Sequence, residues 1–141
     1  MNNLSYHESH SHGPLGLPFQ AYSQEDPCGQ YFVPYHWHEE VEFIYVTRGS
    51  LVLRTQNRTR LLQEGHIYFI NPGTLHGLFG NSPFSHHYAL VFRLDMLNFL
   101  QTDSCQTSYL VPLCSGKYLF PDSEALAPEL TAQIAALIKK A

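Results

Sequence analysis

The chain has 141 residues, of which 44% are hydrophobic, 13% aromatic and only 14% charged. That length fits one domain with a sizeable core and leaves no room for a second full domain, and the composition argues against disorder over most of the chain. Lys and Arg number 8 against 12 Asp and Glu, which gives a net charge of -4. Because nucleic-acid-binding surfaces usually carry a basic excess, we expect no nucleic acid contact by this chain alone.

The sequence also argues against a membrane protein, a secreted protein and a disulfide-rich protein. Apolar runs such as residues 88–92 end at Arg93 and Asp95, far short of the roughly 20 residues that a membrane-spanning helix requires. The N-terminal region has no Lys or Arg before Arg48 and no continuous apolar run, unlike a secretory signal. The three cysteines form no close CxxC pair. We therefore expect a cytoplasmic protein without a membrane segment.

Residues 1–18 make up a polar N-terminal segment that contains His7, His10 and His12. Short polar termini with little apolar periodicity are usually untethered, so we expect a flexible arm. The functional alternative is an arm that folds over a ligand.

Residues 19–94 predict a mainly β domain, because short β-rich runs alternate with turn residues about every 8 to 12 positions. This spacing is typical of an antiparallel sandwich or barrel, and no alternation of strands with helices appears. The predicted strands cover 31–35, 41–47, 51–56, 60–63, 66–70, 77–79 and 86–92.

Residues 95–141 predict a helical tail. Asp95 is placed to cap a short helix over 96–100, and an extended piece is expected over 109–113. A final helix is predicted from apolar residues spaced three and four positions apart: Leu126, Leu130, Ile134, Leu137 and Ile138. Such a stripe packs either on the barrel or against the same helix of a second chain, which would give a homodimer.

The most informative segment runs from His36 to Glu42. On an extended strand, His36, His38 and Glu42 share one parity and point into the same interior. His76, after the turn over 72–75, is the candidate for a further ligand from a neighbouring strand. Imidazoles together with a carboxylate suit a divalent transition metal such as Zn, Ni, Fe or Mn, with open positions for a substrate or water.

Structural interpretations compete with the functional ones. A His-x-His pair can simply be hydrogen-bonded or solvated, Trp37 is expected at the rim, and of His86 and His87 one is expected outward and the other hydrogen-bonded. Half of the basic residues gather on one hairpin, where they either solvate edge strands, which we favour, or bind an anionic effector: Arg48, Arg54, Arg58 and Arg60.

A family resemblance rests on these same residues. Their order resembles two motifs of the cupin superfamily: His36-x-His38-x3-Glu42-x6-Gly49, followed by Gly65, Pro72 and His76, with one residue fewer between the last two than is usual. Two sequence segments are more similar still to the amino-terminal sensor domain of AraC-type transcription regulators: HWHEEVEFIYVTRGS at positions 36–50 and INPGTLH at positions 70–76. The resemblance covers residues 30–100 in detail and the helical tail in outline.

This resemblance implies a cupin-type jelly-roll barrel that holds a small effector, followed by helices that pair two subunits. In that family a DNA-binding unit of two helix-turn-helix motifs normally follows the tail, and none fits in this chain. We therefore expect a flexible arm over 1–18, a barrel over 19–94 and a dimerisation tail over 95–141, with DNA bound through a domain that this chain lacks.

The leading hypothesis is a small-molecule effector-binding and dimerisation domain of an AraC-type regulator, with no catalytic residues. The alternative is a small metal-dependent cupin enzyme, such as a dioxygenase or isomerase. The residues expected to line the pocket are His36, His38, Glu42, Ile44, Val46 and His76, of which the three histidines and Glu42 are the candidate metal ligands.

Overall fold

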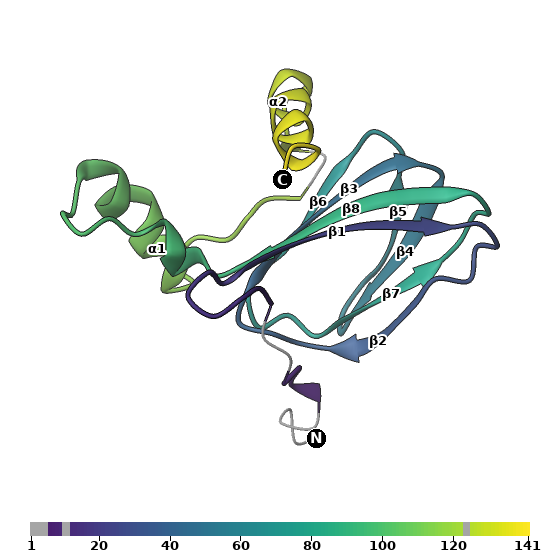
Figure 1. The fold of residues 1–141 in the computed structure, drawn as a ribbon, viewed down its shortest axis with the longest axis horizontal. Coiled ribbons are helices and arrows are strands. Elements are labelled where there is room, and N and C mark those ends of the chain that lie inside the picture. The colour runs from purple at the N-terminus through teal and green to yellow at the C-terminus, as the bar shows by residue number, and fades with distance from the viewer. Residues whose placement is uncertain (1–5, 10–11, 123–124) are drawn as a thin grey trace.

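The structure is a computed structural model that describes residues 6–9, 12–122 and 125–141, so His10 of the arm lies outside the described residues. Its strands are β1 (Phe19–Asp26), β2 (Phe32–His36), β3 (Val41–Arg48), β4 (Ser50–Thr55), β5 (Thr59–Gln63), β6 (Ile67–Ile70), β7 (His76–Gly80) and β8 (Ser85–Phe92). They form two antiparallel sheets, in the orders β1-β8-β3-β6 and β2-β7-β4-β5, that face each other (Figure 1). This strand order is that of an eight-stranded jelly roll, which confirms the predicted mainly β fold.

The alternation of side chains along β3 explains how the two layers form. Glu42, Ile44 and Val46 point between the sheets and are buried, whereas Phe43 and Tyr45 point to the outer face and are half-buried. Because both faces of β3 carry apolar side chains, its outer face requires a cover. The cover comes from the C-terminal helix, which takes the first of the two placements expected for it, on the barrel.

The interior of the barrel is an apolar core. Ile44, Val46, Leu51 and Leu62 are fully buried there, and residues from both sheets complete the cluster: Leu53, Tyr68, Ile70, Leu78 and Ala89. Close packing of branched side chains from opposite sheets fixes the separation of the layers. This core provides the rigid frame on which the site residues lie.

All seven predicted strands are present, with ends that differ by a few residues at most, but β1 was not predicted. β1 pairs with β8 over its full length, from Phe19 opposite Phe92 to Asp26 opposite Ser85. Its sequence, FQAYSQED, mixes polar and apolar residues on each face, so the period-two signal is weak. Pairing with a long neighbouring strand compensates for that weak local preference.

The tail differs from the prediction in two places. A 3₁₀ helix, η2 (Leu94–Leu97), begins after Arg93, and Asp95 lies inside it rather than capping it, with its carboxylate 2.7 Å from the Arg93 guanidinium. The extended piece expected over 109–113 is wrong, because this stretch is helical: a π-helix, η3 (Gln106–Leu110), continues into α1 (Val111–Cys114). The Asp103 carboxylate accepts a hydrogen bond from the Gln106 backbone N–H at 2.7 Å and starts that turn.

The predicted final helix is present as α2 (Pro128–Ile138), and it lies over the outer face of the β1-β8-β3-β6 sheet (Figure 1). Ala135 and Ile138 are buried against that face beside Ile67, and Phe43 and Tyr45 pack around them. Of the predicted stripe, Leu130 and Leu137 remain 44% and 66% exposed. Within the described ranges, none of the helices is long and apolar enough to cross a membrane.

Candidate metal and effector site

Three histidines converge at one end of the barrel. His36 ends β2, His76 begins β7 directly opposite it, and His38 follows in the loop that leads to β3. One nitrogen of each ring lies within 4.8 Å of the others. The Gly73 backbone N–H donates to the His38 carbonyl at 2.8 Å, so the two motif segments are held together by their backbones as well.

The ring nitrogen that faces away from this centre is hydrogen-bonded in all three histidines. The Nδ1 atoms of His36, His38 and His76 lie 2.9, 3.0 and 2.7 Å from the backbone carbonyls of Pro34, Glu40 and Thr74. A carbonyl oxygen only accepts, so Nδ1 carries the proton and, in the neutral ring, Nε2 presents a lone pair. This is the tautomer that a metal ligand needs, fixed by backbone partners.

Glu42 reaches the centre from β3 in the other sheet. Its Oε2 lies 3.4 Å from His38 Nε2 and 3.3 Å from His76 Nε2, and the residue is 6% exposed. Burial alone would raise the pKa of Glu42, but the two neighbouring imidazoles outweigh it and hold that pKa well below its usual range. The carboxylate is therefore ionised at neutral pH.

The pKa values of His38 and His36 shift in opposite directions. Burial lowers the pKa of His38, but the Glu42 carboxylate more than offsets it, and the pKa of His38 is raised. For His36, which lies nearer the solvent, burial dominates and lowers the pKa. If His38 is protonated, its Nε2 proton faces Glu42, and a divalent cation would displace that proton on binding.

The donor set fits a divalent transition metal. The Nε2 atoms of His38 and His76 are buried and find no hydrogen-bond partner among the described residues. In the neutral tautomer these atoms and the Glu42 carboxylate are all acceptors that face one another, an arrangement that a cation between them would satisfy. The structure thus brings together the histidines and carboxylate singled out from the sequence.

A second polar cluster lies inside the barrel on β8. His87 and Ser85 are each 1% exposed, and both ring nitrogens of His87 and the Ser85 hydroxyl lack hydrogen-bond partners among the described residues. The Tyr31 ring contacts His87 edge-on, with 5.0 Å between ring centroids. Burial lowers the pKa of His87 to about 4, so this ring stays neutral and can both donate and accept a hydrogen bond.

The sequence did not reveal this second cluster. Its neighbour His86 points outward and is hydrogen-bonded to Ser23 and Thr47, which confirms the expectation that one of the pair points outward. The expectation that the inward residue, His87, is hydrogen-bonded is wrong for the described part of the chain. Parity along β8 alone could have identified the inward set Ser85, His87, Ala89 and Val91.

The remaining predicted pocket residues belong to the core. Ile44 and Val46 are fully buried and pack within the apolar core cluster. Their part in ligand contact stays a prediction. Trp37 is half-buried, and its ring lies tilted against that of His7, with 4.3 Å between centroids.

The arginines of the basic hairpin contact the tail and a neighbouring strand rather than the histidine centre. Arg58 and Arg60 both pair with the Asp122 carboxylate, at 3.3 and 3.1 Å, and the Arg54 guanidinium lies over the Phe79 ring. Arg48 Nε donates to the Phe84 carbonyl at 2.5 Å, so all four arginines make contacts within the chain, which supports a structural role for them.

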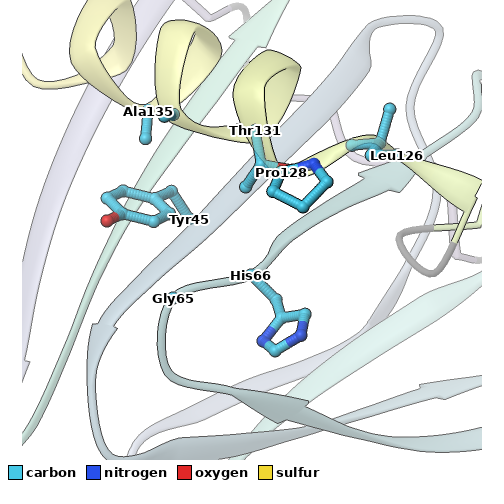
Figure 2. A pocket seen from close by; sticks show the side chains of 8 residues that line it. Tyr45, Gly65, His66, Leu126, Pro128, Thr131 and Ala135 are labelled. Carbon is cyan, nitrogen blue, oxygen red and sulfur yellow. The ribbon is translucent and has the colours of Figure 1, made fainter.

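A groove of about 420 Å³ lies outside the barrel, between α2 and the strands beneath it. Figure 2 shows Thr131 and Ala135 of the helix facing the ring of Tyr45, with His66 on the turn below. Since Tyr45 points to the opposite face of β3 from Glu42, this groove is separated from the histidine centre by the sheet itself.

Comparison with solved structures finds several similar chains. KdgF from Halomonas sp. aligns with a TM-score of 0.47 and 25% identity over 56% of this chain and 75% of its own. Oxalate decarboxylase from Bacillus subtilis, described with Mn(II) centres, aligns with a TM-score of 0.46 and 17% identity over 57% of this chain and 22% of its own.

Among curated sequences, the chain is similar to the uncharacterised HTH-type transcriptional regulator YdeC of Bacillus subtilis (strain 168). The two are 33% identical over 45 residues, which is 32% of this chain and 16% of that regulator. The match therefore spans only a small part of the regulator's length. The model of the AraC-like ligand binding domain matches residues 20–141, which is most of the chain. The jelly roll with its polar end and helical tail thus belongs to the family of AraC-like ligand binding domains.

Proposed function

We propose that this domain binds a small-molecule effector inside the barrel and transmits its occupancy, through the arm and the C-terminal helices, to a DNA-binding unit of an AraC-type regulator. The observation that carries the proposal is a set of buried nitrogens, of His38, His76 and His87, that have no hydrogen-bond partner within the described part of the chain and lie in a mainly apolar interior. Leaving such groups unpaired costs about 1–3 kcal/mol each, and a ligand with hydroxyl, carbonyl or carboxylate oxygens would remove that cost.

The effector class follows from the two clusters. His87 and Ser85 offer neutral donors and acceptors, whereas the histidine centre holds a carboxylate and accepts cations or hydroxyl protons. We infer an oxygen-rich small molecule, bound by hydrogen bonds at the β8 cluster and directly or through a metal at the histidine centre.

A divalent metal is part of this proposal. His36, His38, His76 and Glu42 are the residues that would hold it, and the metal would act as a Lewis acid that fixes one oxygen of the effector. The three backbone carbonyls that orient the histidines would keep the site formed in the absence of the ion.

We also propose that the domain pairs with a second copy of itself. An apolar groove of about 310 Å³ lies where α2 meets the sheet and η2, and exposed Leu97 and Leu137 line it. Exposed leucines beside a groove of this kind favour a protein partner. DNA binding through another domain and a cytoplasmic location belong to the same proposal.

A metal-dependent enzyme is the second candidate function, and the specific observation in its favour is the same donor set with Nε2 atoms aimed at one point. His38→Ala would then abolish both metal binding and turnover. Full metal occupancy without any turnover on candidate substrates, together with ligand-dependent stabilisation, would favour the sensor.

The test of the proposed function combines elemental analysis with ligand screening. The protein is prepared without nickel resin, beside a His36→Ala, His38→Ala double variant and a His87→Phe variant. We expect about one equivalent of one metal in the parent and none in the double variant. A panel of sugars, hydroxy acids and aromatic acids is screened by thermal denaturation. Stabilisation that disappears in His87→Phe would support the effector site, and no stabilisation by any oxygen-bearing compound would count against it.

A further inference from the structure

The N-terminal arm lies against the barrel beside the histidine centre. The Trp37 backbone N–H donates to the Tyr6 carbonyl and the Glu8 N–H donates to the Trp37 carbonyl, each at 2.9 Å. These two bonds join His7 to Trp37 as a short parallel bridge. The arm therefore adds a strand-like segment immediately next to His36 and His38.

Within this segment Glu8 is held in place by His12. The Glu8 Oε2 atom lies 3.0 Å from His12 Nε2, and His12 Nδ1 lies 2.9 Å from the Tyr22 hydroxyl of β1. Because an ionised carboxylate only accepts, His12 Nε2 carries the proton and the tyrosine hydroxyl donates to Nδ1 of the neutral ring. His12 is 6% exposed and packs over the His38 ring, with 5.5 Å between centroids.

This arrangement aims the Glu8 carboxylate at the histidine centre. Its Oε2 lies 3.7 Å from His36 Nε2, while His36 Nδ1 is already bonded to a backbone carbonyl. A carboxylate oxygen and an imidazole lone pair therefore face each other without a proton between them. The same relation holds between Glu42 and the two deeper imidazoles, on the inner side of the centre.

Charge favours a role for both carboxylates. A divalent ion held by three neutral imidazoles and one carboxylate would retain a net positive charge in a half-buried site, where an uncompensated charge is costly. Glu8, whose side chain is 27% exposed, supplies the second negative charge from the solvent side. The centre would then be neutral and bracketed by Glu42 below and Glu8 above.

We propose that Glu8 is a metal ligand supplied by the arm, so that a divalent transition metal binds the arm to the barrel. This inference rests on the proposed metal centre and extends it to the arm. Metal binding and docking of residues 6–9 would then stabilise each other.

Trp37 makes the proposal directly measurable, because it is the only tryptophan of the chain and its ring lies against that of His7 in the arm. The full chain, free of any tag, is titrated with Zn²⁺ while heat of binding and Trp37 emission are recorded. Glu8→Gln removes the charge but keeps the shape, and Glu25→Gln, an exposed carboxylate on β1, is the matched control. We expect Glu8→Gln to weaken Zn²⁺ binding by about tenfold or more and to lose the Zn²⁺-dependent change in Trp37 emission.

The outcomes separate this inference from the proposed metal centre. Equal Zn²⁺ affinity and an equal Trp37 response in the parent and Glu8→Gln would overturn the role of Glu8 and leave the centre standing. A parent that binds no Zn²⁺, or a His36→Ala, His38→Ala variant that binds it as tightly as the parent, would overturn both. Loss in Glu8→Gln with retention in Glu25→Gln would establish the arm as part of the centre.

Discussion

At the scale of single residues, the centre depends on one buried carboxylate. Glu42 is the only one of the four candidate ligands that comes from the β1-β8-β3-β6 sheet, and it contacts the buried imidazoles of His38 and His76. We expect Glu42→Gln to reduce Zn²⁺ affinity by about 10- to 100-fold, because the substitution removes the charge that balances the cation. Calorimetric titration measures the effect, and Glu39→Gln, on the exposed loop nearby, is the control. Unchanged affinity in Glu42→Gln would remove Glu42 from the centre.

His87 gives the domain a defined dependence on pH. Its pKa is lowered by burial from 6.5 to about 4, with Tyr31 packed against the ring and His86, Asp26 and Glu42 as the nearby charges. Between these two values the unfolded chain binds a proton that the folded chain does not, so this contribution to stability is complete above about 6.5 and is lost as the pH falls toward 4. The lost free energy is on the order of 3 kcal/mol.

The variant His87→Leu isolates that contribution. Denaturant unfolding of the parent and of His87→Leu is measured between pH 4 and pH 7, the range spanned by the two pKa values. The difference between their unfolding free energies should change with pH, with the parent losing more stability in acid. Parallel curves would show that His87 does not stay neutral in the folded barrel.

At the scale of elements, the two faces of helix α2 allow folding stability and dimerisation to be tested separately. Ile138 is 2% exposed against the sheet, whereas Leu137 beside it is 66% exposed. Ile138→Ala should destabilise the domain by about 2–5 kcal/mol, the usual cost of a large cavity. Leu137→Ala should cost little in the monomer, since its side chain packs on little within the chain.

The same pair tests the proposed dimer. Sedimentation of Leu137→Glu should show more monomer than the parent if α2 lies in the interface, with the unfolding free energy of the monomer nearly unchanged. An unaltered sedimentation profile in Leu137→Glu would show that this face of α2 does not form a dimer interface.

Strand β7 contains a second element-scale test. A Cβ on Gly80 would collide with the Gly29 carbonyl and lie 2.6 Å from the Asp26 carboxylate, which itself holds the backbone of Gln30 and Tyr31. Gly80→Ala should therefore cost about 1–3 kcal/mol. Gly77→Ala, whose nearest neighbour is the Phe79 ring at 3.1 Å, should cost less, and thermal denaturation of both variants measures the difference. Equal costs would mean that the 26–31 loop yields easily.

At the scale of the whole molecule, the sequence predicts the barrel better than its surroundings. Strands such as β3 and β8 have strong apolar patterns, so their ends were found within two residues. β1 has no such pattern and depends on its partner β8. The segment 109–113 has strand-forming residues, yet it folds as helix, with Pro112 in the first turn of α1, a position that suits proline.

Part of the candidate site could likewise be predicted from the sequence, and part could not. The sequence predicts that His36, His38 and Glu42 converge because they share one parity on an extended strand. The structure does bring them together, but from the end of β2, the loop after it and β3 of the other sheet. The motif order adds His76. The missing partners of His87 depend on how the two sheets pack, and the approach of Glu8 depends on contacts of the arm with Tyr22 and Trp37. No local pattern encodes distances between segments so far apart in the chain.

The position of Glu42 in one sheet and of His36 and His76 in the other has a consequence for how the domain loses its structure. An ion held by all three would act as a removable cross-link between the two layers at the open end of the sandwich. Its contribution grows with the logarithm of the free metal concentration, by about 1.4 kcal/mol for each tenfold increase above the dissociation constant. The melting temperature would then report the metal supply of the surroundings, and a chelator would loosen the two layers without breaking a covalent bond.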